Sequence, residues 1–158
     1  MEGKGKPPLY IPSMKNQVKT QSSFKKDHIL IGTWNVRTLY KDGRIENVMK
    51  EMKRMKISIL GLCETRHTGA GDFLFEKHNI IYSGGSKHER GVGIILDETK
   101  ARSLIGYQAI SDRVLLVKLK SKPLYINFIQ VYAPTADSTE SSIELFYEEI
   151  NLAMKEAM

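Results

Sequence analysis

The sequence has 158 residues, 41% of them hydrophobic and 27% charged, which is typical of one soluble globular domain with a buried core. Its apolar stretches are too short to cross a bilayer, and its single cysteine, Cys63, cannot form an intrachain disulfide and is expected to be a packed structural thiol. We therefore expect an intracellular protein, in the nucleus or cytoplasm, with no membrane partner and no small-molecule cofactor.

The net charge of +6 is concentrated in the first 27 residues. This segment carries six lysines against Glu2 and Asp27, a balance of +4, and it is rich in Lys, Pro, Gly, Ser and Gln without an apolar period. The composition predicts a disordered basic tail over residues 1–27, followed by a folded domain over residues 28–158. The tail either contacts nucleic acid through its lysines or is a solvated leader without a function, and the sequence leaves both readings open.

The folded part opens with a strand, a helix and a strand. Apolar runs predict strands over residues 29–36 and 57–64, and residues 43–56 between them predict an amphipathic helix. One face of this helix gathers five apolar side chains that we expect to belong to the core, namely Ile45, Val48, Met49, Met52 and Met55.

The rest of the chain predicts further strands and a second long helix, which together indicate an α/β protein. The stretch over residues 124–132 is apolar on both faces, which predicts a central strand. Residues 139–158 predict a helix that begins with a capping box formed by Ser141 and Glu144. The predicted strands cover residues 79–83, 91–96, 114–120 and 124–132.

Each of the first two strands ends on one polar residue, Asn35 in the first and Glu64 in the second. Because a strand–helix–strand crossover places both strand ends at the same edge of a sheet, we expect the two side chains to lie together. An amide and a carboxylate are hard oxygen donors that suit Mg²⁺. A turn-capping asparagine and a solvated glutamate are the ordinary alternative, and the residues by themselves leave both open.

Four short segments follow one another along the chain: TWNVR over residues 33–37, ILGLCET over 59–65, GVGII over 91–95, and VYAP over 131–134. The residues and the order of these segments resemble the motifs of the endonuclease/exonuclease/phosphatase superfamily. The resemblance is to the apurinic-type endonuclease domains of non-LTR retrotransposons and the craniofacial development protein 2-like proteins in particular. The resemblance covers residues 29–158. It implies a DNase I-like sandwich of two mixed β-sheets flanked by helices, in four layers, of which this sequence holds about the first half.

The resemblance also implies roles for three residues. Asn35 and Glu64 hold Mg²⁺ or Mn²⁺, with Glu64 as the principal carboxylate ligand, and Tyr132 hydrogen-bonds the phosphate in the transition state. The implied reaction is hydrolysis of a DNA phosphodiester bond, and DNA is the implied partner of the complete domain. Without the resemblance, Tyr132 is better interpreted as an aromatic plug at the end of a strand.

Two motifs of the superfamily do not occur in the sequence: the Ser-Asp-His motif that activates the attacking water, and an Asp-x-Asn motif. Ser111-Asp112-Arg113 lacks the histidine and is not counted, and the four histidines are expected at the surface.

We therefore expect residues 28–158 to be the N-terminal part of the domain, truncated at its C-terminus and inactive or nearly so alone. The alternative is a non-catalytic remnant that binds nucleic acid or protein. Half a sandwich is also expected to leave the inner face of a sheet uncovered, which favours self-association or aggregation.

Overall fold

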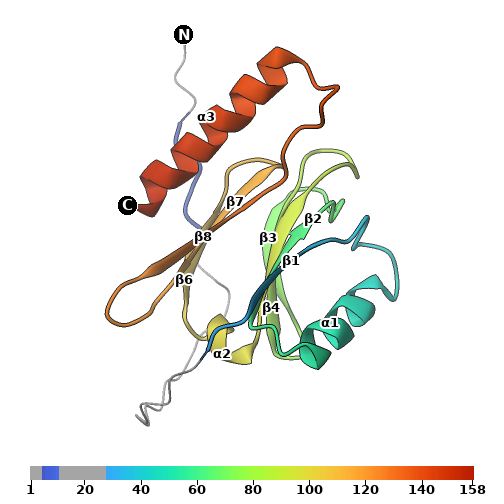
Figure 1. The fold of residues 1–158 in the computed structure, drawn as a ribbon, viewed down its shortest axis with the longest axis vertical. Coiled ribbons are helices and arrows are strands. Elements are labelled where there is room, and N and C mark those ends of the chain that lie inside the picture. The colour runs from blue at the N-terminus through green and yellow to red at the C-terminus, as the bar shows by residue number, and fades with distance from the viewer. Residues whose placement is uncertain (1–4, 11–27) are drawn as a thin grey trace.

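The computed structural model describes residues 5–10 and 28–158, which form two β-sheets with helices on their outer faces (Figure 1). Within this part of the chain, no helix combines the length and the apolar character that a membrane crossing requires. In chain order the elements are β1 (Ile31–Asn35), α1 (Arg44–Arg54), β2 (Ile59–Cys63), β3 (Ala70–Phe75), β4 (His78–Ser83), β5 (Val92–Leu96), α2 (Glu98–Ala101), β6 (Leu104–Ala109), β7 (Val114–Leu119), β8 (Ile126–Val131) and α3 (Glu140–Ala157).

The larger sheet has five strands in the order β1-β2-β5-β4-β3. β1 and β2 are parallel and joined by α1, as predicted, and the remaining pairs are antiparallel. Val48, Met49 and Met52 of α1 are buried against the outer face of this sheet. Met55, which was predicted to share that core, is 51% exposed, because it is the C-cap residue and the helix ends just before it.

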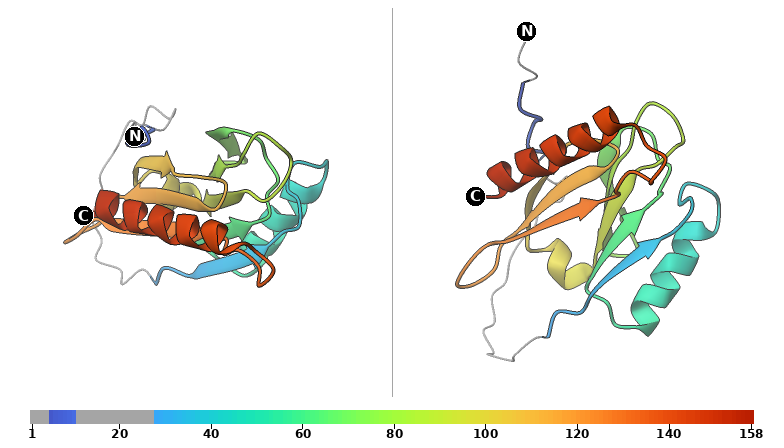
Figure 2. Two further views of the ribbon diagram at one scale, coloured as in Figure 1. Left: turned by 90° about the horizontal axis from the view of Figure 1, so that it is seen from above. Right: turned by 45° about the horizontal axis from the view of Figure 1, so that its top comes forward.

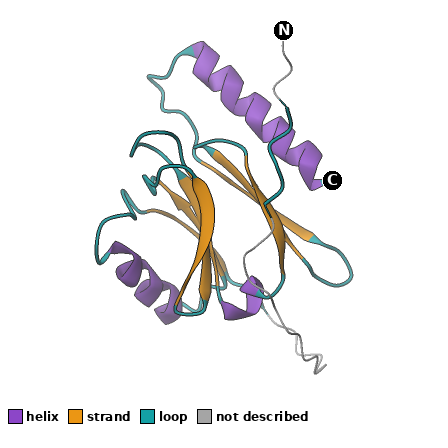
Figure 3. Cartoon of the chain, turned by 180° about the vertical axis from the view of Figure 1, so that it is seen from behind, coloured by secondary structure: helices purple, strands orange, loops and turns teal. Residues whose placement is uncertain are grey.

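The smaller sheet has three antiparallel strands in the order β6-β7-β8, and α3 packs on its outer face through a cluster that includes Val114, Phe146 and Ala153 (Figure 3). The predicted central position of β8 is wrong. β7 is the central strand and β8 is an edge strand. β8 is half-buried along its whole length, because the larger sheet covers one of its faces and α3 covers the other. Its apolar residues therefore indicate that both faces are covered, and they do not indicate that both edges are paired.

The predicted helix over residues 139–158 corresponds to α3, but its cap is a different residue. The side-chain oxygen of Thr139 accepts a hydrogen bond from the backbone N–H of Ser142 at 3.3 Å. The predicted capping box of Ser141 and Glu144 is therefore shifted from the true N-cap by two residues.

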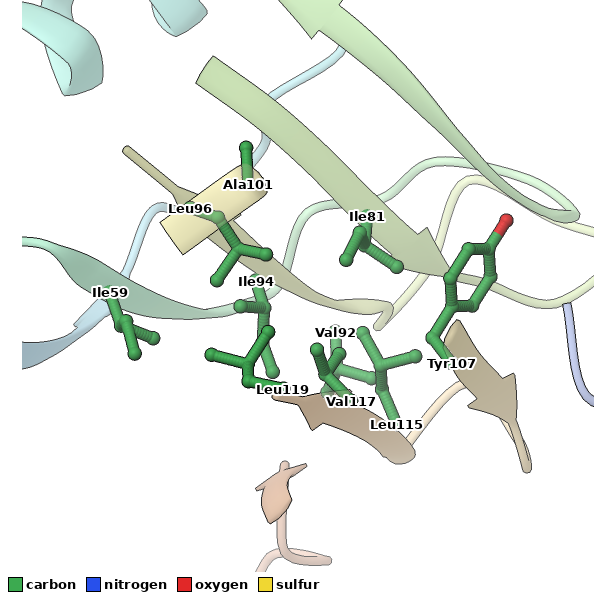
Figure 4. Packing of buried hydrophobic residues seen from close by; sticks show 10 residues of the cluster. All are labelled: Ile59, Ile81, Val92, Ile94, Leu96, Ala101, Tyr107, Leu115, Val117 and Leu119. Carbon is green, nitrogen blue, oxygen red and sulfur yellow. The ribbon is translucent and has the colours of Figure 1, made fainter. Parts of the chain in front are cut away.

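The two sheets pack face to face, which gives four layers in the order α1, larger sheet, smaller sheet, α3 (Figures 1 and 3). Burial of each large apolar side chain in such an interface stabilises the fold by about 1.5–3 kcal/mol. Ten buried residues make up this inter-sheet core, namely Ile59, Ile81, Val92, Ile94, Leu96, Ala101, Tyr107, Leu115, Val117 and Leu119 (Figure 4).

The inner faces of the sheets thus cover one another, so the prediction that half a sandwich leaves an inner face uncovered is wrong. The edge strands β1 and β8 lie on the same side of the sandwich (Figure 2). A cleft of about 300 Å³ opens between them, lined by residues of both strands such as Ile31 and Phe128. Leu30, just before β1, and Ile31 and Trp34 of β1 are exposed.

Part of the predicted disordered tail has a defined place in the structure. Tyr10 pairs with Tyr107 of the edge strand β6 through two backbone hydrogen bonds of 2.8 and 3.0 Å, and the two rings are stacked. Lys6 forms an ion pair of 2.8 Å with Glu156 of α3. Residues 5–10 of the predicted tail thus contact β6 and α3, and the division of the chain into a tail and a domain stays a prediction. Residues 1–4 and 11–27 lie outside the described part of the chain.

Candidate active site

The structure brings Asn35 and Glu64 together. Asn35 is in register with Cys63 on the parallel pair β1 and β2, and backbone hydrogen bonds continue beyond the strands, from Thr38 N to Glu64 O at 2.7 Å. The Asn35 side chain donates from Nδ2 to Glu64 Oε1 at 2.9 Å. The two strand ends therefore meet at one sheet edge, as the crossover predicted.

The backbone fixes the orientation of the Asn35 amide. Its Oδ1 accepts a hydrogen bond from the backbone N–H of Arg37 at 3.1 Å, which turns Nδ2 toward Glu64. This local turn is the capping behaviour expected of an asparagine at a strand end. Here the turn and the contact with the carboxylate occur together.

Tyr132 reaches the same carboxylate from the other sheet. It follows β8, and its hydroxyl donates to Glu64 Oε1 at 3.0 Å. Burial above all, and then the hydrogen bond to Glu64, raise the pKa of Tyr132, so the phenol is protonated at neutral pH and available as a donor. All three predicted residues thus share one oxygen atom across the two sheets.

Arg113 holds Tyr132 in place. Its guanidinium lies 5.2 Å from the centre of the Tyr132 ring and donates from Nη1 to Tyr132 O at 2.9 Å. The backbone N–H of Tyr132 in turn donates to Arg113 O at 2.9 Å. A cation over the ring and two hydrogen bonds restrict both the backbone and the ring of the tyrosine.

The Glu64 carboxylate is stabilised in its ionised form. The hydrogen bond from Asn35 is the largest cause that holds the pKa of Glu64 below its usual range, and Tyr132, Arg66 and Arg37 act in the same direction against partial burial. The second oxygen, Oε2, lies 3.6 Å from Nη2 of Arg66. Glu64 is therefore an anion at neutral pH with one oxygen shared by two donors and the other beside a guanidinium.

A polar pocket of about 370 Å³ opens beside these residues, lined by Glu64, Arg66, His88, Glu89, Arg90 and Tyr132. Arg90 forms an ion pair with Asp112 at 3.3 Å, and Arg66 and Arg90 bring two guanidinium groups to one wall. Guanidinium groups bind phosphate oxygens through paired hydrogen bonds.

Backbone strain gathers around this pocket. Among the described residues, eight other than glycine have positive φ, and five of these surround the site: Arg37 (47°), Thr38 (110°), Glu64 (57°), Arg66 (58°) and Arg90 (52°). Left-handed conformations of side chains with a Cβ cost free energy and occur preferentially where function demands a particular side-chain direction. At 110°, β-branched Thr38 departs furthest from the favoured region.

The residues fit a hard divalent cation as far as donor chemistry goes. Mg²⁺ takes one or two carboxylates, keeps several waters and accepts phosphate oxygens from the substrate. Glu64 supplies an ionised carboxylate, and Asn35 can supply an amide oxygen by rotating its amide away from Arg37. In the described part of the chain, no group of three or more His, Cys, Asp or Glu side chains is arranged to hold a metal.

The residues that support the three predicted ones were not expected from the sequence. Ser111-Asp112-Arg113 does not match the Ser-Asp-His motif, yet Arg113 orders Tyr132 and Asp112 pairs with Arg90. Among the histidines expected at the surface, His88 is exposed but lines the pocket, and His67 is half-buried. No signal in the sequence marked these residues, because their partners are remote along the chain.

Cys63 is the packed thiol that the sequence predicted. Its Sγ donates to Val131 O at 3.3 Å and accepts from Gln130 Nε2 at 3.2 Å. Burial raises the pKa of the Cys63 thiol, which keeps the sulfur protonated and unreactive.

Comparison with known proteins found no protein-family model that matches the chain. Two curated proteins are similar in sequence: craniofacial development protein 2 from Bos taurus, 37% identical over 126 residues, and the same protein from Tragulus javanicus, 36% identical over 126 residues. These matches cover 79% of this chain and 21% and 22% of the two relatives. The chain thus spans about a fifth of their length.

Three solved structures have a similar fold. The endonuclease domain of TRAS1, a telomere-specific non-LTR retrotransposon, aligns with TM-score 0.55 at 16% identity, over 78% of this chain and 51% of that domain. The AP endonuclease LMAP from Leishmania major aligns with TM-score 0.57 at 14% identity, over 79% of this chain and 46% of that chain. The Xenopus laevis APE2 catalytic domain aligns with TM-score 0.54 at 13% identity, over 78% of this chain and 54% of that domain.

The chain therefore has a DNase I-like fold and spans about half of each of these three solved chains. Over the 126 aligned residues it is a homologue of craniofacial development protein 2.

Proposed function

We propose that this chain supplies the metal- and phosphate-binding part of an endonuclease domain of the retrotransposon type, which hydrolyses DNA phosphodiester bonds with the help of Mg²⁺ or Mn²⁺. The observation that supports the proposal best is the sharing of Glu64 Oε1 by Asn35 and Tyr132, at 2.9 and 3.0 Å. Three side chains from two sheets meet at one ionised oxygen beside a pocket with two arginines. The solved structures of similar fold include the endonuclease domain of a retrotransposon and an AP endonuclease.

In this proposal each residue has one task. Glu64, kept ionised by its neighbours, and Asn35 hold the ion, which when bound stabilises the charge that develops on the phosphate. Tyr132 is a neutral donor at the same point and turns its hydroxyl to a phosphate oxygen. Arg66 and Arg90 attract the anionic backbone of the substrate, and Arg113 keeps Tyr132 in position.

We expect little or no hydrolysis by this chain alone. His88, the histidine that lines the pocket, engages its Nδ1 with Arg66 O at 2.8 Å, and because a carbonyl can only accept, that nitrogen carries the proton. This nitrogen is therefore bonded to a backbone carbonyl and not to the carboxylate of an Asp–His pair.

The second candidate function is a non-catalytic remnant that binds nucleic acid or protein. One observation favours it: Arg66 already places a cation 3.6 Å from Glu64 Oε2, where a metal ion would otherwise neutralise the carboxylate. A pocket balanced internally in this way binds phosphate through its arginines without a metal.

Binding of a labelled DNA duplex to the full chain, measured with and without Mg²⁺ over a series of salt concentrations, tests the proposal. Mg²⁺ is expected to tighten binding by the wild type and by the control Glu89→Gln, which alters a carboxylate in the same pocket, but not by Glu64→Gln. A steep salt dependence that Mg²⁺ leaves unchanged would favour the remnant.

A plasmid-nicking assay tests the expectation of inactivity. We expect the wild-type chain to leave supercoiled plasmid intact in Mg²⁺. Nicking that depends on Mg²⁺ and disappears in Glu64→Gln would show that the chain is an active enzyme, and it would support the roles given to the three residues.

A further inference from the structure

A ladder of five rings leads from the larger sheet to the pocket. Phe73 and Tyr82 lie 6.1 Å apart on neighbouring strands β3 and β4, and His67, from the loop after β2, lies 5.0 Å from Tyr82. Tyr40, from the loop after β1, lies 6.4 Å from His67 and 4.4 Å from His88, all measured between ring centres. The ladder thus joins the hairpin of β3 and β4 to His88, which lines the polar pocket beside Glu64.

The inner rings of the ladder are accounted for by packing. Phe73, Tyr82 and His67 are half-buried, and burial lowers the pKa of His67, which keeps that imidazole neutral. They form a rigid base. The outer pair is different, since Tyr40 is 42% exposed and His88 is also exposed.

The Tyr40 and His88 rings of the outer pair lie against each other at the surface, with their centres 4.4 Å apart. The Tyr40 and His88 rings are inclined by only 32°, and the hydrogen bond from His88 Nδ1 to Arg66 O, 2.8 Å long, holds the imidazole in its orientation. Two ordered rings at the surface can stack on a third ring without losing much side-chain entropy.

Two guanidinium groups and two carboxylates lie beside this surface, because Arg66 and Arg90 line the pocket together with Glu64 and Glu89. His88 shares the pocket with Arg66 and Arg90, so one pocket combines two guanidinium groups and an aromatic edge. Proteins that hold single-stranded nucleic acid use this combination, with cations on the backbone and aromatic rings on the bases. A fully paired duplex offers phosphates but keeps its base faces stacked, so it can use only half of such a surface.

We propose that the Tyr40–His88 pair stacks on an unpaired DNA base while Arg66 and Arg90 hold the adjacent phosphate, so that the substrate class is DNA with an unpaired nucleotide next to the phosphate in the pocket. This inference rests on the proposed function, because it assigns the ligand to the same pocket. It adds a preference for unpaired over fully paired DNA, which the metal-site residues do not explain.

Fluorescence anisotropy of the full chain with a labelled oligothymidine strand and a labelled, fully paired blunt-ended duplex, both without metal, tests the inference. Tyr40→Ala should weaken binding of the single strand at least about fivefold, since stacking contributes to each bound base, and should leave duplex binding unchanged. Tyr147→Ala is the matched control, because this tyrosine is 60% exposed on α3 and its ring contacts only Phe146 among the described rings. Single-strand binding that Tyr40→Ala does not alter, or an equal loss for strand and duplex, would overturn the inference.

A second variant keeps the test valid if Tyr40→Ala unfolds. Tyr40→Trp, in a Trp34→Phe background that removes the natural tryptophan, restores a ring to the surface. Its fluorescence should be quenched by the single strand and not by the duplex, and absence of quenching at saturating strand would overturn the inference.

The proposed function and this inference can fail separately. Glu64→Gln removes the effect of Mg²⁺ if the metal role is right, and it leaves the single-strand preference in place if the stacking surface is right. Preference for the single strand without any response to Mg²⁺ would refute the metal role alone.

Discussion

Gly84 and Gly85 are adjacent glycines between β4 and β5, and the structure distinguishes sharply between them. A methyl group added at Gly84 would lie 1.7 Å from the backbone carbonyl oxygen of His67. One added at Gly85 would meet nothing closer than Asp112 Oδ2 at 3.4 Å, which is ordinary contact. Because the obstacle at Gly84 is backbone, we expect Gly84→Ala to push the loop over residues 64–69 away from β4, while Gly85→Ala is accommodated.

The magnitude follows from the overlap. Insertion of a methyl group into a packed region costs about 1–3 kcal/mol, which for a domain of this size lowers Tm by roughly 3–12 °C. At Gly85 the substitution only reduces the freedom of the unfolded chain, which stabilises by about 0.4–1 kcal/mol. Urea unfolding and thermal melts followed by circular dichroism measure both effects. Equal stability of the two variants, or a Gly84→Ala protein as stable as the wild type, would refute the reasoning.

Two further predictions concern the smaller sheet and its helix. Thr139→Ala should lower the free energy of unfolding by about 1 kcal/mol, because the threonine caps Ser142 N, while Ser141→Ala should change it little; urea unfolding that ranked Ser141→Ala as the costlier change would contradict this. Burial first, and then Asp72, raise the pKa of Tyr107, so the stability due to its neutral hydroxyl is complete below the unfolded pKa of about 10 and falls as the pH rises above it. Tyr107→Phe should therefore lose less stability than the wild type between about pH 8 and about pH 11, and equal losses would count against the assignment.

The first crossover could be predicted from the sequence because its signals agree. Strong apolar runs flank a helix with a clear period of 3.6, and the parallel geometry of such a unit follows from chain connectivity. The meeting of Asn35 with Glu64 is a direct consequence of that geometry. Tyr132 follows a strand of the other sheet, so local pattern did not place it beside Glu64, and the family resemblance implied only that it hydrogen-bonds the phosphate.

The elements that the sequence did not predict lack those signals. β3 begins with Ala70, Gly71 and Asp72, which are poor strand formers, and its turn to β4 uses Glu76 and Lys77 at φ 46° and 72° where Asn-Gly would be expected. These residues adopt the strand and turn because pairing with β4 overrides their local preference.

The supporting residues of the site were hidden for a different reason. Arg113 acts on Tyr132 across 19 positions of sequence, and His88 contacts Arg66 across 22. Such contacts depend on how hairpins fold back, and a motif search that asks for Ser-Asp-His passes over Ser111-Asp112-Arg113. The strained backbone around the pocket is equally invisible, because none of its five left-handed residues is a glycine.

In the described part of the chain, β1 and β8 are edge strands on the same side of the sandwich, which has a consequence for assembly. The outer edges of these two strands present backbone N–H and C=O groups to which an extended segment, from this or another molecule, can hydrogen-bond as an additional strand. The free energy of unfolding is then expected to rise with protein concentration, because association of folded molecules through these edges shifts the folding equilibrium toward the folded form.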